Sequence, residues 1–161
     1  MEYLIHLAIL ICIYGILGLG LNLVVGFTGL LSVTHAAFYG IGAYVTAILL
    51  TTLGMNFFVS IICGMIVTAV LSLAIGYVLS KFKDDYYALG SFGFNIIIYS
   101  IFLNWQSLTR GPLGIPGISR PELFGFTFSD NLSFLVLSLV IGLIIYGACQ
   151  YITRSSFGRV L

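Results

Sequence analysis

The longest uncharged stretch of the sequence restricts the fold more than any other feature. No Asp, Glu, Lys or Arg occurs between Tyr3 and Ser80. A helix that crosses the hydrocarbon core of a bilayer needs about 20 mostly apolar residues, so this stretch has room for three such helices. Soluble domains carry about a quarter charged residues, whereas this chain has 7% charged and 60% hydrophobic residues. We therefore expect the lipid bilayer to be its main solvent.

Turn-forming residues and charges divide the chain into five predicted spans. Gly26–Gly29 and Leu53–Asn56 interrupt the uncharged stretch, and the charged segment Lys81–Asp85 ends it. The predicted membrane helices cover residues 3–25, 37–53, 57–80, 86–105 and 132–152. We expect an all-α, polytopic transmembrane helical bundle that forms a single domain over residues 1–161, with a loop at residues 106–131.

The distribution of basic residues predicts the orientation of these spans. With five spans, four of the six Lys and Arg residues share one face: Lys81, Lys83, Arg154 and Arg159. Short cytoplasmic loops carry an excess of Lys and Arg. We therefore expect a multi-pass protein of the cytoplasmic (inner) membrane, with its N-terminus outside and its C-terminus inside. A formal net charge of +1 provides no basic surface for nucleic acid.

Glycines and polar residues near positions 26–36 separate the first predicted helix from the second. Irregular backbone at membrane depth is tolerated only against protein or a water-filled cavity, and transporters use broken helices near their substrates. We therefore expect a helix break at Gly26 and Gly29, although an ordinary turn at the membrane surface fits equally. Candidate residues of a substrate pathway in this region are Asn22, Thr28, Ser32 and His35.

Small residues recur at every fourth position of the third predicted helix: Ser60, Gly64, Thr68, Ser72, Gly76 and Ser80. Small side chains let a neighbouring membrane helix approach closely. Four residues overshoot one turn of 3.6 residues, so the stripe winds around the helix and only part of it faces one neighbour. We assign Gly64, Thr68, Ser72 and Gly76 to helix packing, and a pore lining is the alternative.

The segment Thr109–Ile118 combines glycine and proline in a way that excludes a regular helix. Proline removes a backbone donor and glycine permits unusual dihedral angles, so we expect a compact series of turns. Three apolar residues between the breakers, Leu113, Ile115 and Ile118, are expected to pack this loop over the helix ends. A plain connector is the alternative.

The sequence contains no motif that supports catalysis. It has neither a G-x-x-x-x-G-K-[ST] phosphate loop nor an H-E-x-x-H metal motif, and no carboxylate lies within a predicted span. Ion-coupled carriers place ionisable groups there, so we expect the energy source to reside on another subunit. His6 and His35 could serve as haem ligands, but a hydrogen-bonding role for His35 is preferred. We therefore assign no catalytic residue, metal ligand or cofactor.

Four segments carry a resemblance to a known family. The run from Leu21 to Tyr44 reads L-N-L-V-V-G-F-T-G-L-L-S-V-T-H-A-A-F-Y-G-I-G-A-Y. It closely resembles the N-terminal signature of permeases in branched-chain amino acid ATP-binding cassette (ABC) importers, the LivH/LivM family, and the LivM branch above all. The segments Asp85–Leu89, Asn104–Ile118 and Arg154–Leu161 resemble the same branch.

The resemblance implies a membrane permease subunit that translocates branched-chain amino acids or related small solutes. It also implies a second permease subunit, two ATP-binding subunits that hydrolyse ATP, and an extracytoplasmic solute-binding protein. Urea and short-amide importers belong to the same family, and a passive membrane channel without an ATPase is a further alternative. Family members are about twice this length, so the chain is expected to be the N-terminal part of a longer permease.

Overall fold

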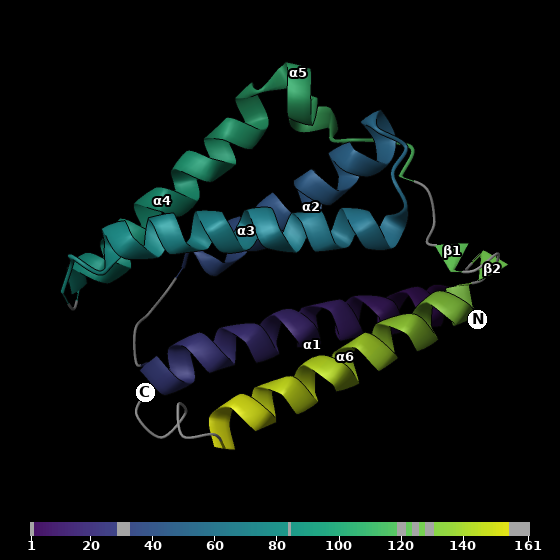
Figure 1. The fold of residues 1–161 in the computed structure, drawn as a ribbon, viewed down its shortest axis with the longest axis horizontal. Helices are drawn as coiled ribbons and strands as arrows, with labels where there is room; N and C mark the ends of the chain where they lie inside the picture. Colours follow the sequence, from purple (N-terminus) through teal and green to yellow (C-terminus); the bar gives the residue numbers. More distant parts are fainter. Residues whose placement is uncertain are drawn as a thin grey trace. The chain divides into compact units, whose positions relative to one another are not determined.

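The computed structural model describes residues 2–28, 33–83, 85–118, 122–123, 126–127 and 131–154, and Figure 1 shows its elements in order. These elements are α1 (Glu2–Thr28), α2 (His35–Thr52), α3 (Phe57–Leu79), α4 (Asp85–Asn104), α5 (Gln106–Thr109), the 3-10 turn η1 (Gly111–Leu113), β1 (Glu122–Leu123), β2 (Phe126–Thr127) and α6 (Asn131–Arg154).

The predicted transmembrane helical fold is confirmed. In the described ranges, five helices are long and apolar enough to cross a membrane: α1, α2, α3, α4 and α6. The largest boundary difference is at the first helix, which was expected to end at residue 25 and ends at Thr28. Large apolar side chains such as Leu73, 75% exposed, face outward on these helices. Such exposure is typical of a surface that contacts lipid or other subunits.

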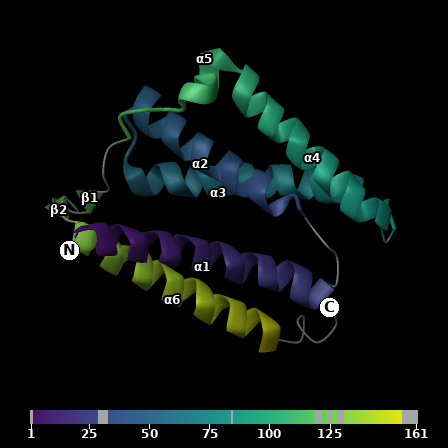
Figure 2. The ribbon, with the colours of Figure 1, turned by 180° about the vertical axis from the view of Figure 1, so that it is seen from behind.

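The chain divides into two compact units, which are residues Met1–Leu30 with Phe126–Leu161, and residues Leu31–Gly125. In the first unit, α1 and α6 lie side by side and run in the same direction (Figures 1 and 2). The Asn131 amide nitrogen lies 3.5 Å from His6 Nε2 near their first turns. Further along, a Cβ on Gly142 would lie 3.5 Å from the Ile16 side chain. Parallel packing is consistent with α1 and α6 being the first and fifth spans, because odd-numbered spans cross the membrane in the same direction.

The second unit is built on an antiparallel hairpin of α2 and α3. Gly54 adopts a φ of +60°, which favours glycine, and it reverses the chain after α2. The Asn56 side-chain oxygen accepts a hydrogen bond from the Phe58 N–H at 3.0 Å and so caps the first turn of α3. The predicted break at Leu53–Asn56 is therefore the turn of this hairpin.

Aromatic packing joins α4 to α2. The rings of Tyr44 and Phe102 are stacked with their centroids 4.5 Å apart. A Cβ on Gly40 would lie 2.8 Å from the Phe102 ring, so glycine provides the space that this ring occupies.

A buried threonine anchors the loop that follows α4. Thr109 is 2% exposed, and its hydroxyl oxygen lies 2.6 Å from the Phe102 carbonyl oxygen and 2.8 Å from that of Trp105. The Gly111 N–H donates to the same hydroxyl at 3.3 Å. Gly111 has a φ of +57°, and a Cβ there would lie 2.8 Å from the Leu103 carbonyl oxygen. The geometry at residue 111 therefore requires glycine.

Two details of this loop differ from the sequence-based expectation. Residues Gly111–Leu113 form one 3-10 turn, which tolerates Pro112 because the first turn of a helix needs no donor there. The side chain of Leu113 is 91% exposed and does not pack over the helix ends. The polar contacts of Thr109 hold the loop instead, so Leu113 is not needed as an apolar anchor.

Candidate functional site

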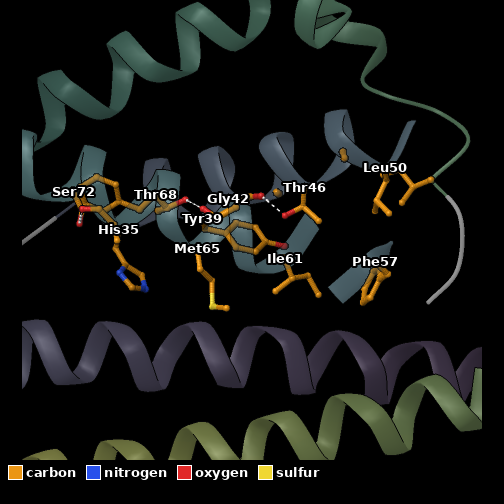
Figure 3. A pocket seen from close by; sticks show the side chains of 16 residues that line it. His35, Tyr39, Gly42, Thr46, Leu50, Phe57, Ile61, Met65, Thr68 and Ser72 are labelled. Carbon is orange, nitrogen blue, oxygen red and sulfur yellow. Dashed lines mark hydrogen bonds between the residues drawn. The ribbon is translucent and has the colours of Figure 1, made fainter. Parts of the chain in front are cut away.

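A groove with a volume of about 600 Å³ runs along the α2–α3 hairpin (Figure 3). Its lining residues recur every three or four positions, so they form one face of each helix. They are His35, Phe38, Tyr39, Gly42, Ala43, Thr46, Ala47 and Leu50 of α2, Phe57, Ile61, Gly64, Met65, Thr68, Ala69 and Ser72 of α3, and Ile118 of the loop.

The floor of the groove consists of two reciprocal Gly-x-x-x-Thr segments. Because α2 and α3 are antiparallel, Gly42 lies opposite Thr68, and Gly64 lies opposite Thr46. A Cβ on Gly42 would lie 3.3 Å from Thr68 Oγ1, and a Cβ on Gly64 only 2.5 Å from Thr46 Oγ1. The same Cβ on Gly64 would also lie 3.2 Å from the Gly42 carbonyl oxygen. The two backbones thus approach closely at these glycines, as small residues permit between membrane helices.

The small-residue stripe of α3 leaves this interface along its length. Ser60 is fully buried and Gly64 is buried, whereas Gly76 is exposed, and a Cβ there would meet no atom of the described residues within 4 Å. Ile75 and Leu79 are the buried residues at that end of the helix. Thr68 and Ser72 lie between these extremes, and both line the groove. Packing and lining are therefore not exclusive roles for this part of the stripe.

The threonine and serine hydroxyl groups in the groove are already bonded within their own helices. Thr46 donates to the Gly42 carbonyl oxygen, Thr68 to that of Gly64, and Ser72 to that of Ala69, each at 2.8 Å. Within the described ranges, neither the His35 ring nor the Tyr39 hydroxyl makes a hydrogen bond. These two groups keep their full capacity to bind a polar partner.

The backbone just before α2 is tied to α4. The Val33 N–H donates to Ser91 Oγ at 3.2 Å, and the Ser91 hydroxyl donates to the Ala88 carbonyl oxygen at 2.8 Å. Ser91 is fully buried, and Thr34 is 1% exposed, with no hydrogen-bond partner for its hydroxyl oxygen among the described residues. Thr34 has helical dihedral angles, so its side chain does not cap α2. The backbone at Val33 is therefore bonded to α4, and the side chain of Thr34 is buried.

The structure places the predicted pathway residues in different elements. His35 is the first residue of α2 and lines the groove. Asn22 is an exposed residue of α1, and its Oδ1 lies 3.1 Å from where a Cβ on Gly26 would be. Thr28 is the last residue of α1, but its side chain is outside the described part, as are Gly29 and Ser32.

The first two helices are separate, but the separation begins after Gly26. Helix α1 continues through Gly26 to Thr28. A single glycine costs only about 1 kcal/mol in a helix, and lipid favours backbone groups that bond within the helix. The backbone outside both helices, as far as it is described, consists of Val33 and Thr34.

Sequence reasoning missed four residues of this region: Gly42, Thr46, Thr34 and Ser91. The first pair carried a usable signal, because Gly42–Thr46 has the same Gly-x-x-x-Thr form as Gly64–Thr68. Thr34 lies between Ser32 and His35 in the sequence, but no local pattern indicates that its side chain is buried. Nothing in the local sequence marks Ser91, since its role depends on a contact with a residue 58 positions away.

Comparisons with known proteins agree with the resemblance found in the sequence. The family described as "Branched-chain amino acid transport system / permease component" matches residues 3–161. The protein "High-affinity branched-chain amino acid transport system permease protein LivM" of Salmonella typhimurium is 39% identical over 127 residues, which is 79% of this chain and 30% of that protein. The protein of the same name from Escherichia coli K12 is 39% identical over 125 residues, or 78% of this chain and 29% of that protein.

This chain thus spans about 30% of the length of these curated relatives. No solved structure matches it at a significant level. The family match nevertheless covers both compact units and all five long helices. The chain belongs to the family of permease components of branched-chain amino acid transport systems, and it resembles the LivM branch.

Proposed function

We propose that this chain is part of a membrane permease subunit of an ABC importer that moves branched-chain amino acids or related small solutes across the cytoplasmic membrane. The observation that carries this proposal is the family match over residues 3–161, together with 39% identity to two LivM proteins. The same match spans both compact units, which supports assigning them to one permease domain.

The α2–α3 groove is the proposed wall of the solute path. It is mostly apolar, as small-molecule sites usually are, and its volume lies within their usual range. His35 contributes a polar group at the start of α2. Asn22, Thr28 and Ser32 remain proposed members of the path, with the helix break at Gly29.

The energy for transport is proposed to come from other subunits. The sequence has no phosphate-binding loop of the Walker type, and the family resemblance implies two separate ATP-binding subunits that would hydrolyse ATP. A second permease subunit and an extracytoplasmic solute-binding protein complete the proposed importer. The excess of basic residues at Lys81, Lys83, Arg154 and Arg159 supports a cytoplasmic location for that face.

Uptake in cells tests this proposal. A host that lacks its own leucine importers would express the complete permease that contains this chain, together with its partner genes, and uptake of labelled leucine would be measured. The control carries an inactive ATP-binding subunit. We expect uptake that needs the active ATPase and is competed by excess isoleucine and valine. Uptake competed by urea or acetamide but not by isoleucine would contradict the proposed solute class, and equal uptake in the control would contradict the ABC mechanism.

A further inference from the structure

Helices α2 and α3 begin in different ways, although each follows a residue whose side-chain oxygen is suited to capping. Before α3, Asn56 has a ψ of 141°, and its side chain accepts a hydrogen bond from the Phe58 N–H. Before α2, Thr34 has a φ of −64° and a ψ of −15°, and its side chain makes no cap. Threonine is a preferred N-cap residue, but capping needs dihedral angles outside the helical region. Helix α2 therefore follows a capping residue in a conformation that does not cap.

This uncapped arrangement leaves a buried hydroxyl without a partner in the described part of the chain. Thr34 is 1% exposed, and its Oγ1 has no hydrogen bond there. The first four N–H groups of an α-helix have no acceptor within the helix, and a threonine cap would satisfy one of them. A buried polar group without a partner is unfavourable. Another interaction at this site must therefore oppose capping.

The bond between Val33 and α4 is that interaction. The Val33 N–H donates to Ser91 Oγ at 3.2 Å, one residue before Thr34. The Thr34 carbonyl oxygen accepts from the Phe38 N–H at 3.2 Å, and this bond is also present in a capped helix. Rotation about ψ of Thr34 would therefore leave α2 in place and turn the Thr34 side chain together with the backbone that precedes it. The Val33 N–H would leave Ser91 as the threonine hydroxyl reaches the end of the helix.

The rotation exchanges one interaction for another of similar strength. A side-chain cap and a single hydrogen bond each change an equilibrium about fivefold. The Ser91 hydroxyl keeps its 2.8 Å bond to the Ala88 carbonyl oxygen in both arrangements, so losing the Val33 N–H does not leave it unbonded. Two conformations that differ this little in free energy are both populated.

From this balance we propose that Thr34 is a hinge with two positions. In one position, the Val33 N–H is bonded to Ser91 and α2 is uncapped. In the other, the Thr34 hydroxyl caps α2 at the N–H of Ala36 or Ala37, and the chain before α2 is released from α4. The α2–α3 hairpin keeps its packing in both positions, because the rotation lies outside the helix. The hinge gives the chain that enters α2 two directions, and it does not depend on which solute the permease carries.

Amide hydrogen exchange, resolved to single residues by mass spectrometry, tests the hinge in the complete permease in detergent micelles. Thr34→Val removes the capping oxygen, whereas Thr34→Ser keeps it and is the matched control. The Val33 amide should exchange about fivefold more slowly in the valine variant than in the parent, because the released position loses its cap. In the serine variant its rate should stay within about twofold of the parent. A hydroxyl that is merely buried would give no such difference.

Removing the bond to α4 tests the other side of the equilibrium. Ser91→Ala should speed exchange of the Val33 amide about fivefold. It should also slow exchange at Ala36 or Ala37 about two- to threefold, because the capped position becomes more populated. Adding Thr34→Val to this variant should abolish the slowing.

A buried serine of α6 provides the control for Ser91. Ser138 is 7% exposed, and its hydroxyl also donates at 2.8 Å to the carbonyl oxygen three residues earlier. Ser138→Ala should change the exchange of none of these amides.

Two results would overturn the hinge and leave the proposed function standing. One is equal exchange of the Val33 amide in the parent and in both Thr34 variants. The other is faster exchange at Val33 in Ser91→Ala without slower exchange at either Ala36 or Ala37, which would identify the bond to Ser91 as a fixed structural contact.

Discussion

Substitution of Gly64 by alanine measures how much the close approach of α2 and α3 contributes to stability. A Cβ at this position would lie 2.5 Å from Thr46 Oγ1 and 3.2 Å from the Gly42 carbonyl oxygen. The threonine hydroxyl donates to that same carbonyl at 2.8 Å, so rotating it away breaks a hydrogen bond. The carbonyl belongs to the backbone and moves only if the helix moves. Gly76 on the same helix is the matched control, because its Cβ would meet no atom within 4 Å.

The expected cost follows from these contacts. Overfilling a packed interface costs about 1–3 kcal/mol, while replacing glycine by alanine in a helix returns about 1 kcal/mol. The second term applies to both positions and cancels in the comparison. Gly64→Ala should therefore be less stable than Gly76→Ala by about 1–3 kcal/mol.

Unfolding in detergent micelles, followed by circular dichroism, gives this difference. A double-mutant cycle with Thr46→Ala identifies its cause, because removing the hydroxyl should make alanine at position 64 tolerable. We expect a favourable coupling energy of about 1 kcal/mol or more between the two sites. Equal stability of the Gly64 and Gly76 variants, or a coupling near zero, would refute the proposed close approach.

Three further comparisons test other parts of the structure. Thr34→Val should leave stability unchanged or raise it, because its buried hydroxyl has no hydrogen-bond partner in the described part of the chain. Thr109→Val should lower the free energy of unfolding by about 1–3 kcal/mol. Equal losses of thermal stability in the two variants would contradict this. Ser91→Ala should lower the unfolding free energy by about 1 kcal/mol because the Val33 N–H loses its acceptor. Ser72→Ala, whose hydroxyl bonds only within its helix, should change it by less than about 0.5 kcal/mol, and a larger loss at position 72 would argue against this explanation. Cysteines at positions 83 and 115 should react with an impermeant reagent from opposite sides of the membrane, and labelling of both from one side would refute the predicted orientation.

The membrane helices were predictable because their signal is local. A span of about 20 apolar residues bounded by turn residues or charges needs no knowledge of the partner helix, and every observed boundary lies close to the predicted one. The winding of the α3 stripe was also predictable, because it follows from the mismatch between four residues and one turn. Gly64 is buried and Gly76 is exposed, as such winding requires.

The contacts between helices were much harder to predict. The reciprocal pairing of Gly42 with Thr68 depends on the length of the α2–α3 turn, which sets the register of the hairpin. The contact between Val33 and Ser91 joins segments 58 residues apart. The exposure of Leu113 was mispredicted because apolar character suggested an anchor, while the buried hydroxyl of Thr109 holds the loop.

Transport in a purified system tests the central claim most directly. The complete permease that contains this chain would be reconstituted in liposomes with its second permease subunit and ATP-binding subunits, with the solute-binding protein outside and ATP inside. Accumulation of labelled leucine is then measured against liposomes that contain a non-hydrolysable ATP analogue. We predict accumulation that requires hydrolysable ATP and the binding protein. Leucine flux that proceeds at the same rate without ATP and without the ATP-binding subunits would identify a passive channel and contradict the account.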